Sequence, residues 1–113
     1  MTLGDKQKLF MHAVKNLIQY IHEQGYECTL GDGYRDPRVF GAIGETKGYG
    51  YKNSNHKRRL AIDINLFKDG KYLTETEDHR PIGEYWETLN PYARWGGRFN
   101  DGNHYSFEHE GHM

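Results

Sequence analysis

Apolar residues near the start of the chain recur at the spacing of one helix face. They follow the i, i+3, i+4, i+7 rule and comprise Leu9, Phe10, Ala13, Val14, Leu17, Ile18 and Ile21. The pattern predicts a helix over residues 5–24. Thr2 or Asp5 can cap its start, and Gly25 suits the position after its C-terminal end.

Other segments alternate between apolar and polar residues, which is typical of strands. This pattern predicts strands over residues 26–30, 60–67 and 104–109. An Asp-Gly turn at residues 69–70 tolerates positive φ angles, so it predicts a hairpin with a short return strand at residues 71–73.

The remaining segments complete an α+β order. Pro81 opens a second predicted helix, residues 81–89, whose apolar stripe includes Trp86. Residues 38–53 are rich in glycine and predict a long loop. Residues 74–79 are acidic and predict a solvated loop that contains His79. Helix, strand, loop, hairpin, helix and strand together predict an α+β fold, a small antiparallel sheet packed against the N-terminal helix.

Composition narrows the class of protein. A chain of 113 residues predicts one domain, residues 1–113. The formal net charge of −1 argues against a nucleic-acid partner, because such proteins usually carry a strong basic excess. Cys28 is the only cysteine, so an intramolecular disulfide and a multi-cysteine zinc site are excluded, and a small buried hydrophobe is its expected role.

Location and assembly follow from similar arguments. The sequence has no apolar run long enough for a membrane span, so no membrane partner is expected. The first residues, Met1 to Lys6, have no signal-peptide h-region. We therefore expect synthesis in a cytoplasm and action outside the cell only after release. We also expect the protein to be a monomer.

Asp63 is the residue that fits its predicted surroundings least well. In the 60–67 strand it lies on the face opposite the stripe of Leu60, Ile62, Ile64 and Leu66. Aspartate is disfavoured in the middle of a strand unless a partner satisfies its charge. This local violation indicates a functional role for Asp63.

Three further residues could form a catalytic metal site together with Asp63. His56 lies seven positions before it, and Asp101 and His104 lie at the start of the last strand. A catalytic zinc site uses three protein ligands and keeps one position open for water. His56, Asp63 and His104 could supply the ligands, and Asp101 could take a proton from the attacking water.

Spacing alone leaves other interpretations open. His56 could be a solvated residue, with Asp63 paired to Arg58 or Arg59 instead of a metal. Arg35 follows a strand and could anchor a substrate carboxylate, or form a surface ion pair with Asp32 or Asp36.

Motifs in this order are found in one known family. They are Gly33-Tyr34-Arg35; Ser54-Asn55-His56 with Leu60-Ala61-Ile62-Asp63; Trp95-Gly96-Gly97 with Phe99; and Asp101-Gly102-Asn103-His104-Tyr105. With them the chain resembles the zinc peptidases of the D-alanyl-D-alanine carboxypeptidase and L-alanyl-D-glutamate endopeptidase group. These share their fold with the hedgehog signalling domain. The resemblance is greatest to single-domain endolysin-type members from bacteriophages.

The resemblance implies a zinc site and a general base. His56, Asp63 and His104 match the family's Zn²⁺ ligands, and Asp101 matches its catalytic acid/base. The turn at Trp95-Gly96-Gly97 matches the one that positions the last strand.

The resemblance also implies a substrate and a biological role. Arg35 and Ser54 match substrate-side residues, and the substrate would be a peptidoglycan stem peptide. Aspartate rather than glutamate at position 101 favours an endopeptidase that cuts between L-Ala and D-Glu, as a phage lysis enzyme. The alternatives are a D-alanyl-D-alanine carboxypeptidase, a non-catalytic zinc-binding module of hedgehog type, and a metal-free domain with an anion-binding patch at residues 57–59.

Overall fold

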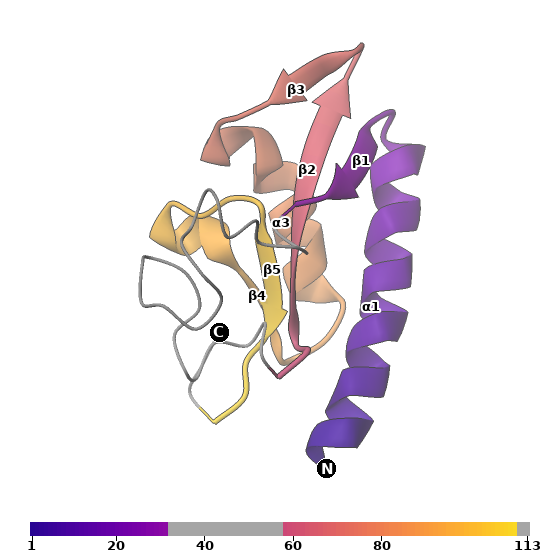
Figure 1. The fold of residues 1–113 in the computed structure, drawn as a ribbon, viewed down its shortest axis with the longest axis vertical. Helices are drawn as coiled ribbons and strands as arrows, with labels where there is room; N and C mark the ends of the chain where they lie inside the picture. Colours follow the sequence, from indigo (N-terminus) through magenta and orange to yellow (C-terminus); the bar gives the residue numbers. More distant parts are fainter. Residues whose placement is uncertain (32–57, 111–113) are drawn as a thin grey trace, which may run out of the picture.

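The computed structural model describes residues 1–31 and 58–110, which form an α+β fold as predicted. Figure 1 shows α1 running along one side of the sheet and α3 behind it. In chain order the elements are α1 (Leu3–Glu23), β1 (Glu27–Leu30), β2 (Ala61–Lys68), β3 (Lys71–Leu73), the 3-10 helix η1 (Thr76–His79), α3 (Arg80–Thr88), β4 (Ala93–Trp95), the 3-10 helix η2 (Gly96–Phe99) and β5 (His104–Phe107).

Both ends of α1 agree with the sequence pattern. The Thr2 hydroxyl accepts a hydrogen bond from the backbone N–H of Asp5 at 3.1 Å, and the Asp5 carboxylate accepts one from the Thr2 N–H at 3.2 Å. This reciprocal capping box satisfies two N–H groups that the first turn cannot pair. Gly25 has φ +88°, so it occupies the left-handed conformation that ends many helices.

The five described strands form one antiparallel sheet. Four of them lie in the order β1-β2-β5-β4, and β3 pairs with the far end of β2. The last strand in the sequence therefore lies inside the sheet, between β2 and β4 (Figure 1). Such a strand is paired on both edges, which fixes its register from two sides.

The hydrophobic core lies between this sheet and the two α-helices that the structure describes, α1 and α3. Phe10 of α1 packs edge-on against Trp86 of α3 and against Phe107 of β5, with ring centroids 5.6 and 5.2 Å apart. The predicted stripe of β2 faces this core, since Leu60, Ile64 and Leu66 are buried. The predicted alternation of β2 is thus confirmed, and Asp63 falls on the opposite face.

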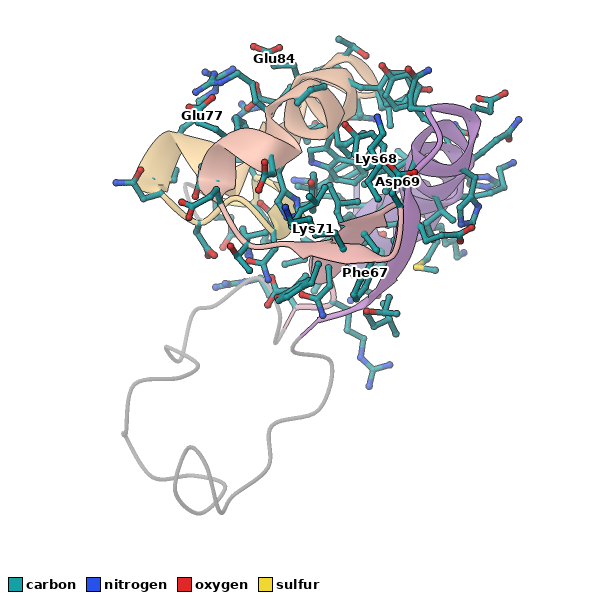
Figure 2. The ribbon with its side chains drawn as sticks, turned by 90° about the horizontal axis from the view of Figure 1, so that it is seen from above. Phe67, Lys68, Asp69, Lys71, Glu77 and Glu84 are labelled. Carbon is teal, nitrogen blue, oxygen red and sulfur yellow. The ribbon has the colours of Figure 1, made fainter. Side chains whose placement is uncertain are left out.

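The predicted hairpin between β2 and β3 is also confirmed. Asp69 and Gly70 both have positive φ angles, 54° and 77°, as a type I′ turn requires. Figure 2 shows Phe67, Lys68, Asp69 and Lys71 around this turn, and Glu77 and Glu84 on the helical side of the molecule.

Two predictions about the second half of the chain are wrong. Residues 93–95 form the strand β4, whereas the sequence pattern predicted a turn at Trp95 and no strand before it. A strand of three residues is too short to show the alternation of apolar and polar residues by which strands are recognised. Residues 76–79 form η1, and His79 is only 3% exposed, so it does not belong to a solvated loop. The predicted loop at residues 38–53 lies outside the described residues.

A buried lysine connects the two ends of the described chain. The Lys6 ammonium donates to the carbonyl of Glu108 at 3.1 Å and lies 3.3 Å from Nδ1 of His109. It also lies 4.1 Å from the centroid of the Tyr92 ring, a cation–π distance.

Within residues 1–31 and 58–110, no helix is both long enough and apolar enough to cross a membrane.

Glycine-to-alanine exchanges should separate tight packing from helix propensity. A Cβ on Gly83 of α3 would overlap the Trp95 ring, so we expect Gly83→Ala to destabilise the protein by about 1–3 kcal/mol. Gly4 in α1 has only the Thr2 hydroxyl nearby, at 3.9 Å, so Gly4→Ala should be neutral or stabilise by up to about 1 kcal/mol. Urea denaturation of both variants measures this, and equal effects would contradict the packing described.

Candidate active site

Asp63 and His104 meet across the β2–β5 pairing. They are directly opposed in the register, and Nδ1 of His104 lies 3.2 Å from Oδ1 of Asp63. Both side chains are well shielded, at 7% exposure for Asp63 and 15% for His104. The partner that a mid-strand aspartate needs is therefore the residue predicted from the sequence. Both lie on the face of the sheet turned away from the helices.

Main-chain atoms of two other segments form hydrogen bonds next to this pair. The N–H of Gly31, just after β1, donates to the carbonyl of Asp63 at 2.7 Å. A Cβ at Gly31 would lie 2.9 Å from the Asp63 Cβ, so only glycine permits this approach. On the other side, the Ile64 N–H donates to the carbonyl of Asn103 at 2.9 Å. Asp63 is thus held by main-chain contacts on both sides.

Asp101 is linked to His104 through a single turn. Its N–H donates to the carbonyl of Gly96 at 3.0 Å, and its own carbonyl accepts from the His104 N–H at 3.1 Å. The Asp101 side chain is exposed. A side chain at Gly96 would collide with the Asp101 carbonyl and come within 2.7 Å of the His104 Cβ. The glycine therefore lets the two residues sit next to η2.

The Trp95 side chain packs in the core and forms a hydrogen bond to this turn. Its indole Nε1–H donates to the carbonyl of Gly102 at 2.7 Å, inside the core. A Cβ on Gly97 would overlap the Trp95 ring, so the second glycine is needed for the same packing. The Trp95-Gly96-Gly97 sequence thus determines where β5 begins, which agrees with the role that the resemblance implied.

Three of the predicted site residues lie outside the described residues. They are His56, the third expected metal ligand, and Arg35 and Ser54, the expected substrate-side residues. In the part of the chain that the structure describes, no group of three or more His, Cys, Asp or Glu side chains could hold a metal ion. That part contains only two members of the predicted set of three.

Asp63 and His104, the two expected ligands that the structure describes, have side chains of the kind that bind zinc. Zn²⁺ binds imidazole nitrogen and carboxylate oxygen, and these are the atoms that Asp63 and His104 direct at each other. Both side chains are only slightly exposed, so few competing contacts with bulk solvent reach their donor atoms. His104 is also held in register by two neighbouring strands, so its ring starts from a fixed backbone.

A polar pocket opens beside Asp101. It has a volume of about 200 Å³ and runs from the end of β3 to the turn before β5. The residues that line it are Tyr72, Leu73, Thr74, Glu75, Thr76, His79, Asn100, Asp101, Gly102 and Asn103. The predicted general base is therefore part of a concave surface that could accept a ligand.

His79 lines this pocket, and sequence analysis did not identify it as a site residue. Its Nδ1 lies 2.8 Å from the Tyr105 hydroxyl, and burial lowers the pKa of the imidazole, with the charge of Asp78 opposing that shift. Burial also raises the pKa of Tyr105 well above its usual range. No periodicity in residues 74–79 marks His79 as buried. A weak signal was its position two residues before Pro81, at the start of a predicted helix that packs against the core.

Other candidates in the described chain have ordinary explanations. Cys28 is partly buried, and burial, with the nearby charge of Glu27, raises the pKa of its thiol. A raised pKa keeps the thiol protonated and unreactive, as expected of a small hydrophobe. His109, a histidine just after the last strand that could also have served as a metal ligand, contacts the Lys6 ammonium at 3.3 Å.

Comparison with known proteins gives one match. Residues 47–107, more than half of the chain, match the sequence model of a family described as D-alanyl-D-alanine carboxypeptidase. The matched segment includes His56, Asp63, Asp101 and His104, whereas Arg35 precedes it. No curated protein matches the chain.

Stability should depend on pH through His79. Its folded-state pKa is lowered, so the unfolded chain binds the proton more readily below about pH 6.5, and stability should fall as the pH drops through that region. We expect the loss of unfolding free energy between pH 7.5 and 5.5 to be smaller in His79→Asn than in the wild type. Urea titrations at both pH values measure it.

A matched control is available on α1. His12 is exposed on the surface of α1, so His12→Asn makes the same chemical change at an unburied site. If His79→Asn showed the same slope as His12→Asn, burial of the neutral His79 ring would not contribute to acid sensitivity.

Proposed function

The chain belongs to the D-alanyl-D-alanine carboxypeptidase family, and on this premise we propose that it is a zinc-dependent peptidase that cuts peptidoglycan stem peptides. Family membership makes it a peptidase that acts on peptidoglycan-like substrates. Support for a metal site in this chain comes chiefly from one observation. Asp63 and His104 meet at 3.2 Å on a shielded rung of the sheet, with Asp101 one turn away.

We assign the metal to three side chains. Asp63 and His104 would hold Zn²⁺ together with His56. When bound, Zn²⁺ polarises a scissile carbonyl and makes water easier to deprotonate. The structure supports the assignment through the choice of donor atoms and the low exposure of the two described ligands.

Asp101 would act as the general base and then as the general acid. Its exposed carboxylate can accept a proton from water as the water oxygen attacks the carbonyl carbon of the peptide. When the C–N bond breaks, the same proton can pass to the leaving amine. The short turn that joins Asp101 to His104 keeps this carboxylate close to the proposed ligands.

The bond that we propose is the one between L-Ala and D-Glu. Its support is the aspartate at position 101, where the dipeptidase branch of the resembling group has glutamate. A second candidate is a D-alanyl-D-alanine carboxypeptidase, which the description of the matching family favours. Arg35 and Ser54 remain the proposed substrate-side residues for either activity.

We propose a phage lysis enzyme as the biological role. The motif resemblance to bacteriophage endolysins supports it, and the protein would act on the cell wall after release from the cytoplasm. We propose that it works as a monomer and needs neither nucleic acid nor membrane. Adding the purified protein to permeabilised bacteria and following their turbidity tests the lytic role directly.

Asp101→Ala should separate catalysis from metal binding. We expect this variant to keep wild-type zinc content and lose at least about 100-fold of its turnover, because it removes the proton acceptor and no ligand. His104→Ala should lose zinc as well as activity, and should melt at a lower temperature because bound metal stabilises the fold. Elemental analysis and mass spectrometry of peptidoglycan digests measure both properties.

The digests also distinguish the alternatives. A new N-terminal D-Glu indicates the endopeptidase, whereas free D-alanine indicates the carboxypeptidase. Bound zinc without any product would indicate a non-catalytic module. An Asp101→Ala variant as active as wild type would place the base elsewhere, and wild-type protein without zinc would overturn the metal assignment.

A further inference from the structure

We propose that His79 is a substrate-binding residue whose Nε2–H donates a hydrogen bond to a neutral amide carbonyl of the peptide, in the pocket that it shares with Asp101. The proposal rests on the proposed function and deepens it. It adds a determinant of substrate position that no sequence motif marked.

The first support is the place of the pocket. Asp101, the proposed general base, and His79 line the same concave surface. Its volume of about 200 Å³ is smaller than the roughly 300–1,000 Å³ typical of pockets that enclose a whole small molecule. A single residue of a peptide that extends past Asp101 suits this space.

The second support is the hydrogen bond on the core side of the ring. Within the described residues, Nδ1 of His79 is the partner of the Tyr105 hydroxyl, at 2.8 Å. A buried phenol proton needs an acceptor, so the Tyr105 O–H donates to Nδ1. The tautomer that follows from this network carries its proton on Nε2. His79 therefore presents a donor on the opposite side of its ring.

The third support is the environment of Nε2. The described residues provide no partner for it, although the side chain is only 3% exposed. Ser106 Oγ is the single fully enclosed side-chain nitrogen or oxygen without a partner in this part of the chain. Nε2 is therefore not sealed in the core, and because Nδ1 faces Tyr105, we place Nε2 on the side of the ring toward the pocket that His79 lines.

The charges of the lining indicate which acceptor would bind. Glu75 and Asp101 are acidic, and none of the lining residues is a lysine or arginine. Burial lowers the pKa of His79, so its ring stays neutral near pH 7. A carboxylate would meet two like charges and no cation, whereas a neutral amide carbonyl would receive the Nε2–H without that penalty.

Two amide variants of His79 separate its two sides. In His79→Asn, Oδ1 can replace Nδ1 as the acceptor for Tyr105, and nothing reaches the position of Nε2. In His79→Gln, the amide nitrogen can replace Nε2–H, and the Tyr105 hydroxyl loses its acceptor. We therefore expect His79→Asn to keep its Tm but raise KM roughly 3- to 10-fold at unchanged kcat, and His79→Gln to keep KM but lower Tm.

A binding measurement removes the dependence on turnover. A synthetic stem peptide, L-Ala-D-Glu followed by a diamino acid and D-Ala, is titrated into Asp101→Ala by calorimetry, with and without His79→Asn. We expect the second change to weaken binding by the same factor as it raises KM. A protein that binds the peptide but cuts no substrate would contradict the proposed function while leaving His79 testable.

Each possible result either supports or overturns the proposed substrate-binding role of His79. Unchanged KM and affinity in a folded His79→Asn variant would overturn the proposal and leave a structural residue. If that variant did not fold, ¹⁵N-labelled imidazole spectra of Asp101→Ala would decide. A proton on Nε2 whose signal moves on peptide addition supports the proposal, and a proton on Nδ1 or an unmoved signal overturns it.

Discussion

The pairing of β2 with β5 is the constraint on which the rest of the candidate site depends. Its register places Asp63 directly opposite His104. A slip of β2 by one residue would turn Asp63 toward the helices, and a slip of β5 would turn His104 there, so either slip would separate the pair and bury a polar group in the apolar core. Because β5 is also paired with β4, a slip of β5 would break hydrogen bonds on two edges. The apolar side chains that bury one face of the sheet therefore also determine that Asp63 and His104 lie together on the other face.

Close backbone approach is the second condition for this arrangement. Gly31 lies against Asp63, and Gly96 lies between Asp101 and His104. At both positions a side chain would occupy space that main-chain atoms of the site already fill. The site is therefore held by strands, turns and a buried tryptophan rather than by long flexible side chains. Residues positioned in this way lose little further freedom when a ligand binds.

Long periodic segments and the proximity of Asp63 to His104 could be predicted from the sequence. The α1 helix, the alternation of β2 and the Asp-Gly hairpin have strong local patterns, and Asp63 was conspicuous because it broke one. β4 was missed because three residues show no period. His79 was misplaced because its burial depends on Tyr105, a residue 26 positions later, and a polar segment gives no sign of such a partner. Contacts of that kind are properties of the fold.

The position of β5 has a consequence for how the protein is made. Of the described strands, β5 is synthesised last, although it lies between β2 and β4 in the sheet. The hydrogen-bond partner of the Lys6 ammonium is likewise a carbonyl 102 residues further along the chain. Before residue 107 has been synthesised, the apolar face of α1 and the edges of β2 and β4 have no permanent cover. Long-range closure of this type slows folding. The nascent chain therefore exposes aggregation-prone surface until β5 has been made.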